Sequence, residues 1–189
     1  MKQAAWFQEL IEMILQRTGL AIREQDGERM CKEIEVLIAR RSGLVPQEYC
    51  ALLKHSGIES ENEWRELLAL VTVGESYFFR DQGQFNVLKD HILPELIALR
   101  SDKRNLRIWS AACSSGEEAY SLAILVSQLL PTWFSGQEWE VTVLGSDINQ
   151  VALEKARQGL YSPWSFRRVE PSLRDLYFTE AGDGWKINS

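Results

Sequence analysis

At 189 residues, with 45% hydrophobic and 25% charged side chains, the chain can form one medium domain or two small ones with a buried core. The formal net charge of −6 and the pI near 5.1 argue against broad binding to nucleic acid, for which a basic surface is expected. The sequence has three cysteines and no C-x-x-C pair, which predicts a protein without a disulfide framework or a metal site. It has no signal peptide and no apolar stretch of membrane-spanning length, which predicts a cytoplasmic protein without direct membrane insertion.

Residues 1–71 are predicted to form a small helical bundle. Apolar residues recur at helical spacing in the stretches Trp6–Ile14 and Met30–Ile38. Pro46 is expected to open a third helix, because proline is favoured in the first helical turn. Ser60–Glu63 has the pattern of a capping box and predicts the start of a fourth helix.

Residues 72–105 are predicted to form a connector followed by a helix. The connector Thr72–Arg80 has three adjacent aromatic side chains, which suits a segment packed against another part of the protein. Pro94 should kink or split the helix that follows. Arg80 has two interpretations. It is either a surface cation beside packed aromatic rings or a guanidinium that binds a carboxylate through its planar fork.

Residues 106–189 are predicted to form part of an α/β domain. Two short apolar runs alternate with two helical patterns, in the order Leu106–Ala112, Ser115–Leu130, Trp139–Ser146 and Val151–Gln158. Strand, helix, strand and helix at this spacing predict a parallel, doubly wound sheet. Two strands do not complete such a sheet, so the domain is expected to be partial. Residues 184–189 have the appearance of the start of another strand.

Two positions of this α/β domain are candidates for a ligand site. Ligands of open α/β sheets bind beyond the carboxyl ends of the strands, which indicates the turn Ala112–Glu118 and Asp147. Small residues and Gly116 let the backbone approach a ligand, and the helix that follows offers free N–H groups. No G-x-G-x-x-G or phosphate-loop pattern is present, so a ligand with a carboxylate and an amine fits better than a pyrophosphate.

Two acidic residues of this site have alternative, structural interpretations. Ser115–Glu118 is itself a capping-box pattern, so Glu118 could serve only to close the helix start. Asp147 could accept hydrogen bonds from ribose hydroxyls, or it could cap the next helix or stabilise a turn. The two positions together favour the functional interpretation, because one adenosine-plus-amino-acid ligand can span both.

These stretches resemble the CheR family of chemotaxis protein-glutamate O-methyltransferases. The matching segments, in the same order and spacing over nearly the whole chain, are Glu75–Asp81, Trp109–Ala123, Gly145–Ile148 and Leu153–Tyr161. Gly74 and Ser76 depart from the asparagine and threonine of many relatives. The family's later Asn-Leu and Cys-Arg-Asn segments have no counterpart in these 189 residues. The resemblance thus implies a helical N-terminal domain followed by the first part of a Rossmann-like methyltransferase domain.

The resemblance also implies a cofactor, a substrate and a set of site residues. The cofactor would be S-adenosylmethionine, and the substrates would be glutamate side chains on the cytoplasmic helices of chemoreceptors or related signalling proteins. Asp147 would hold the ribose, and Arg80, the implied catalytic residue, would lie nearest the reacting carboxylate. By matched position, the cofactor-binding residues would be Ser76, Arg80, Ala112, Glu118 and Asp147.

Two other functions remain open at this stage. The first is a non-catalytic regulatory or binding module that keeps the methyltransferase fold. It is favoured by the incomplete site and by the mixed charge of residues 28–41, where a receptor-binding helix would carry a basic face. The second is methylation of a small molecule. Because the adenine side of the site has no counterpart here, this 189-residue chain is expected to be inactive by itself.

Overall fold

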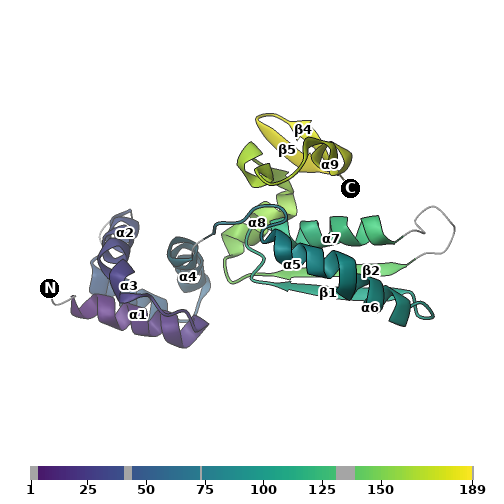
Figure 1. Ribbon diagram of the computed structural model, residues 1–189. Coiled ribbons are helices and arrows are strands. Elements are labelled where there is room, and N and C mark those ends of the chain that lie inside the picture. Colours follow the sequence, from purple (N-terminus) through teal and green to yellow (C-terminus); the bar gives the residue numbers. More distant parts are fainter. Residues whose placement is uncertain (1–3, 41–43, 73, 131–138, 189) are drawn as a thin grey trace. The chain divides into compact units, whose positions relative to one another are not determined.

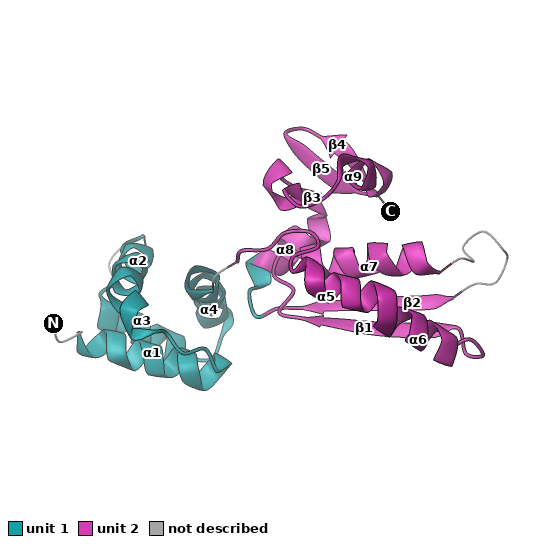
Figure 2. Cartoon of the chain, viewed as in Figure 1, with its two compact units in different colours: residues 1–73, 148–151 teal, residues 74–147, 152–189 magenta. Residues whose placement is uncertain are grey.

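The computed structural model describes residues 4–40, 44–72, 74–130 and 139–188. The chain divides into two compact units, one of residues 1–73 with 148–151 and the other of residues 74–147 with 152–189 (Figure 2). Within the described ranges, no helix is both long and apolar enough to cross a membrane. No group of three or more His, Cys, Asp or Glu side chains among the same residues could hold a metal ion.

The first unit contains the predicted helical bundle. Its helices are α1 (Ala5–Thr18), the 3-10 turn η1 (Glu24–Asp26), α2 (Gly27–Ala39), α3 (Pro46–Lys54) and α4 (Ile58–Val71). The apolar faces meet in one core, in which Phe7, Leu10, Ile14, Ile34 and Leu67 are fully buried. Pro46 opens α3 as predicted, and the Glu48 carboxylate accepts a hydrogen bond from the backbone N–H of Val45 at 3.0 Å.

The predicted capping box at the start of α4 is wrong. The helix begins at Ile58 after Gly57, whose φ of +148° is a conformation that favours glycine. Ser60 is therefore already inside the helix and is buried. Its hydroxyl donates to the carbonyl of Leu53 at 3.2 Å, and the indole N–H of Trp64 donates to the same carbonyl at 2.9 Å. Both bonds satisfy an acceptor at the end of α3 rather than the start of α4.

The second unit starts with the connector and a helix that is interrupted as the proline predicted. α5 (Gln82–Val87) continues into a π-helical turn, η2 (Leu88–Ile92), and then into α6 (Leu93–Leu99). Pro94 lies in the first turn of α6, where its missing N–H costs least. The π-helical turn therefore marks the split in this helix.

The predicted parallel strands are confirmed. β1 (Asn105–Ala111) pairs in parallel with β2 (Glu140–Ser146), so that Ala111 lies opposite Ser146 at the carboxyl ends. α7 (Glu117–Leu129) follows β1 and α8 (Gln150–Gln158) follows β2, and α7 runs along the strand pair (Figure 1).

Among the residues that the structure describes, helices cover one face of this strand pair. On that face, Leu106 packs into a core with residues of the helices, including Phe85, Leu93, Leu122 and Val126. On the other face, Trp109 is 69% exposed and Leu144 is 58% exposed. Parallel sheets in α/β proteins are normally covered on both faces. The observed pair is thus part of a Rossmann-like layer, as the sequence predicted.

A second, antiparallel sheet forms where the sequence predicted only the start of a strand. β5 (Gly184–Ile187) pairs with β3 (Leu160–Tyr161) and β4 (Phe178–Ala181), in the order β3-β5-β4. The short η3 (Pro163–Phe166) and α9 (Pro171–Tyr177) lie between these strands in sequence. The strand predicted near residue 184 therefore exists but does not join β1 and β2.

An aromatic cluster joins this small sheet to the connector. Phe78 is fully buried, stacks on Phe166 at a centroid distance of 4.9 Å, and meets Tyr161 and Phe178 edge to face at 4.8 and 4.9 Å. Such pairs add to the free energy of burial because the ring quadrupoles are complementary. The aromatic run of the connector is thus packed against another part of the unit, as its composition predicted.

Candidate functional site

The turn after β1 has an unusual backbone. Ala112, Ser114 and Gly116 have φ values of +62°, +51° and +91°, so left-handed residues alternate with ordinary ones. For the two residues with a Cβ this conformation is uncommon, and such strain is concentrated at ligand sites. The N–H of Cys113 donates to the carbonyl of Ser146 at 3.0 Å and ties this turn to the end of β2.

Asp147 is joined directly to this turn. Its Oδ2 accepts a hydrogen bond from the backbone N–H of Ser114 at 2.7 Å. Helix α8 begins only at Gln150, so Asp147 is not the residue that precedes that helix. The two positions predicted from the sheet rule therefore lie together at the carboxyl ends of β1 and β2, as they should in a parallel sheet.

The predicted capping box at Ser115–Glu118 is wrong. α7 begins at Glu117, and the residue before it is Gly116 in the left-handed conformation, so the Ser115 hydroxyl lies too early to cap the helix. It donates instead to Glu117 Oε2 at 2.8 Å. Glu118 is exposed, and its Oε1 accepts a hydrogen bond from the hydroxyl of Ser110 at 2.6 Å. Glu118 thus lies at the carboxyl end of β1, near the helix dipole that stabilises its charge.

Glu117 is a polar residue of this region that the sequence did not single out. It is only 3% exposed, and the hydroxyl of Ser165 in η3 donates to its Oε1 at 3.2 Å. It therefore connects the start of α7 to η3. The pair Glu117–Glu118 has no sequence signal that tells which carboxylate faces inward, because that depends on where the helix starts.

The connector passes next to the same turn. A Cβ on Gly74 would lie 3.7 Å from the Ser114 hydroxyl, and Ser76, two residues later, is half-buried. The following residues are anchored through their backbone. The N–H of Phe78 donates to the carbonyl of Ser165 at 3.0 Å, and that of Phe79 donates to the hydroxyl of Ser121 at 3.0 Å. Both α7 and η3 thus fix the connector.

Arg80 projects from the end of this anchored segment. Phe79 before it and Asp81 after it have φ values of +54° and +65°, so the chain turns sharply at this point. The Arg80 side chain is exposed, and its Nη1 donates to the carbonyl of Glu75 at 2.6 Å. Its guanidinium carbon lies 5.8 Å from the ring centroid of Tyr77. The Arg80 side chain thus contacts two residues of its own connector, Glu75 and Tyr77.

Two buried groups of the site are held in their neutral forms. Burial, with the nearby Asp147 carboxylate, raises the pKa of the Cys113 thiol above its usual value. Burial, with Glu117, raises the pKa of Tyr161 well above its usual value, and its hydroxyl donates to the carbonyl of Ser115 at 2.9 Å. Neither group is a thiolate or phenolate nucleophile at neutral pH. Cys113 and Tyr161 therefore contribute neutral, buried groups to this region.

Comparison of the sequence with models of known protein families identifies the family of this chain. Residues 74–189 match the CheR methyltransferase, SAM binding domain. The chain therefore belongs to the CheR methyltransferase family. This match confirms the predicted family, the predicted fold and S-adenosylmethionine as the methyl donor.

Individual relatives are named as chemotaxis methyltransferases. The chain is 35% identical to a probable chemotaxis protein methyltransferase of Rhizobium etli, over 71% of this chain and 48% of the relative. It is 34% identical to chemotaxis protein methyltransferase 2 of Vibrio cholerae, over 66% and 42%. It is 34% identical to a chemotaxis protein methyltransferase of Listeria innocua, over 89% and 60%. The chain spans about half the length of the curated relatives that it matches.

Proposed function

We propose that the protein to which this chain belongs transfers a methyl group from S-adenosylmethionine to glutamate carboxylates of chemoreceptors or similar signalling proteins in the cytoplasm. The observation that carries this proposal is the hydrogen bond between Ser114 N and Asp147 Oδ2, because it joins the two turns that a ligand of this fold would span. The relatives named as chemotaxis protein methyltransferases support the receptor as substrate.

We further propose a role for each residue of the cofactor site. Asp147 accepts hydrogen bonds from the ribose hydroxyls, and Glu118 faces the ammonium of the methionine end. Ala112, which is small and left-handed, leaves room for the ligand against the backbone. Ser76 and Arg80 close the site from the connector. This set fits the cofactor, since the Glu118 carboxylate suits an ammonium group and the Asp147 carboxylate suits the two hydroxyl donors of a ribose.

The chemistry needs little beyond orientation. A glutamate has a pKa near 4.3 in model peptides, so it is already ionised at neutral pH and needs no general base. The bound cofactor supplies a methyl group on a positively charged sulfur. What the protein must provide is alignment of the carboxylate oxygen with that methyl group, which can be worth about 7–11 kcal/mol. Arg80 is the residue that we propose to hold the reacting carboxylate, through the planar fork of its guanidinium.

We also propose how the chain is organised for this activity. Residues 1–71 form a helical domain, residues 72–105 a connector and helix, and residues 106–189 the first part of the methyltransferase domain. One face of the β1–β2 pair is exposed at Trp109 and Leu144, and parallel sheets are normally covered on both faces. The 189-residue chain alone should therefore bind S-adenosylhomocysteine weakly and should transfer no methyl group.

The test is a transfer assay with the full-length protein and methyl-labelled S-adenosylmethionine. The substrate is a chemoreceptor cytoplasmic fragment, with a matched fragment in which the acceptor glutamates are replaced by alanine. We expect label that base releases as methanol, as for a methyl ester, and a loss of about 100-fold in Arg80→Ala. Arg174 is an arginine of α9 outside the proposed site. The variant Arg174→Ala is therefore the matched control and should keep full activity. No transfer, or label that resists base, contradicts the proposal.

A further inference from the structure

Arg167, which directly follows η3, packs on aromatic rings rather than projecting into solvent. Its side chain is only 20% exposed. Its guanidinium carbon lies 3.6 Å from the ring centroid of Tyr77 and 4.5 Å from that of Trp164. The Nη1 atom also donates to the carbonyl of Trp164 at 2.9 Å. An arginine stacked at these distances is strongly restricted in conformation, so it can fix whatever else it contacts.

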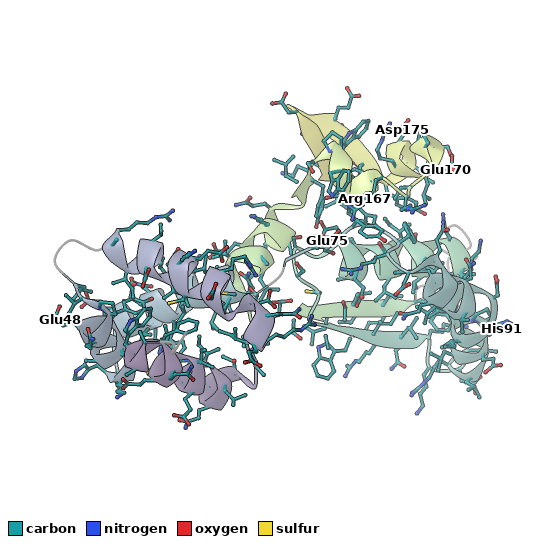
Figure 3. All side chains as sticks on the ribbon, turned by 60° about the vertical axis from the view of Figure 1, so that its left-hand side comes forward. Glu48, Glu75, His91, Arg167, Glu170 and Asp175 are labelled. Atoms are coloured by element: carbon teal, nitrogen blue, oxygen red, sulfur yellow. The ribbon has the colours of Figure 1, made fainter. Side chains whose placement is uncertain are left out.

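The same guanidinium is paired with the connector. Its Nη2 lies 3.2 Å from Glu75 Oε1, and the two residues come from parts of the chain 92 positions apart (Figure 3). Arg167 therefore contacts two residues of the connector at once, the carboxylate of Glu75 and the ring of Tyr77. A lysine ammonium would keep the charge, but it has neither the flat face that stacks on the ring nor the fork of donors that reaches a second partner.

The same two residues also contact Arg80. The Glu75 carbonyl accepts the hydrogen bond from Arg80 Nη1, and the Arg80 guanidinium lies near the Tyr77 ring. We propose that Arg167 is a positioning residue for Arg80. It holds Glu75 and Tyr77, and these in turn set the direction of the Arg80 guanidinium. This inference rests on the proposed function, in which Arg80 binds at the methionine end of the cofactor and near the reacting carboxylate.

The rest of the connector is held without Arg167. Phe78 keeps its backbone bond to Ser165 and its ring contacts with Phe166, and Phe79 keeps its bond to Ser121. Loss of the Arg167 side chain should therefore leave the fold in place and release only the residues that contact Arg80. This separates a positioning role from a general role in stability.

The experiment is a double-mutant cycle in the full-length protein, measured as S-adenosylhomocysteine affinity by calorimetry. We expect Arg167→Ala to weaken binding about 10-fold relative to wild type. In an Arg80→Ala background the same change should not weaken binding of S-adenosylhomocysteine further, because the guanidinium that Arg167 positions is absent. Arg167→Lys keeps the charge but loses the flat stacking surface, and should show most of the loss.

Arg174 offers a matched control. Its guanidinium carbon lies 3.7 Å from the Trp185 ring centroid, and its Nη2 lies 2.8 Å from Asp175 Oδ1, so it has the same kinds of contact. None of the contacts described for Arg174 involves the connector. Arg174→Ala should therefore leave the affinity for S-adenosylhomocysteine within about twofold of the wild-type value.

Each outcome bears on one of the two proposals. If the wild-type protein does not bind S-adenosylhomocysteine, the proposed function fails. If the wild type binds but Arg167→Ala leaves the affinity unchanged, or weakens it equally with and without Arg80, only the positioning role is overturned. Should Arg167→Ala not fold, Arg167→Lys decides the question by the same comparison.

Discussion

Replacing Gly116 by alanine should destabilise the second compact unit by about 2–5 kcal/mol. At φ +91°, any residue with a Cβ is strained, which costs about 1–2 kcal/mol. The added Cβ would also lie 2.7 Å from the Cβ of Ala156 and 3.3 Å from its Cα, so the backbone of α8 would have to move. Overpacking of this kind costs about 1–3 kcal/mol in addition.

Gly182→Ala is the matched control for this change. Gly182 has φ +61°, but no described atom lies within 4 Å of the Cβ that alanine would add. It should therefore lose only the conformational part, about 1–2 kcal/mol. The measurement is urea denaturation of both variants and the wild type by circular dichroism. Equal destabilisation of the two variants, or a neutral Gly116→Ala, would refute the close packing of the turn against α8.

Two further predictions concern buried groups with raised pKa values. Burial raises the thiol pKa of both Cys113 and Cys31, but Cys113 is 3% exposed and Cys31 is half-buried. Because of this difference in exposure, Cys113 should react with a neutral thiol reagent at least about 10-fold more slowly than Cys31, and equal rates would count against the burial of Cys113. The pKa of Tyr161 is raised in the folded state, so the contribution of Tyr161 to stability should be constant below about pH 10 and fall above it, where this side chain ionises only in the unfolded chain. Melting temperatures between pH 8 and 11 check this, and Tyr161→Phe should flatten the alkaline fall; an unchanged slope would contradict it.

The sequence predicted the parallel strand pair well, because long elements carry a clear pattern. The short apolar runs Leu106–Ala112 and Trp139–Ser146, each followed by a stretch with helical spacing, are sufficient to identify β1, α7, β2 and α8. The sheet rule then located Asp147 beside the turn after β1, since parallel strands share one carboxyl edge. The roles of the five predicted cofactor residues stay predictions.

Other features could not be predicted, for identifiable physical reasons. β3 has two residues and β4 has four, too few for a periodic pattern, and the pairing of β5 with both of them depends on the tertiary fold. Both capping boxes failed because a glycine with positive φ, Gly57 or Gly116, moved the start of the helix. Arg167 could not be found from local sequence, because its partner Glu75 is 92 residues away. Contacts of that kind depend on the tertiary fold.

The most direct test of the proposed site is the affinity of the full-length protein for S-adenosylhomocysteine with Asp147→Asn. Asparagine keeps an oxygen that can accept a hydrogen bond from Ser114 N, but it removes the carboxylate charge that we propose to bind the ribose hydroxyls. Hydrogen bonds to a charged group are worth about 1.5–3 kcal/mol, so calorimetry should find binding weakened by about 10- to 100-fold at nearly unchanged melting temperature. An affinity equal to that of the wild type would contradict the assignment of this edge of the sheet as the cofactor site.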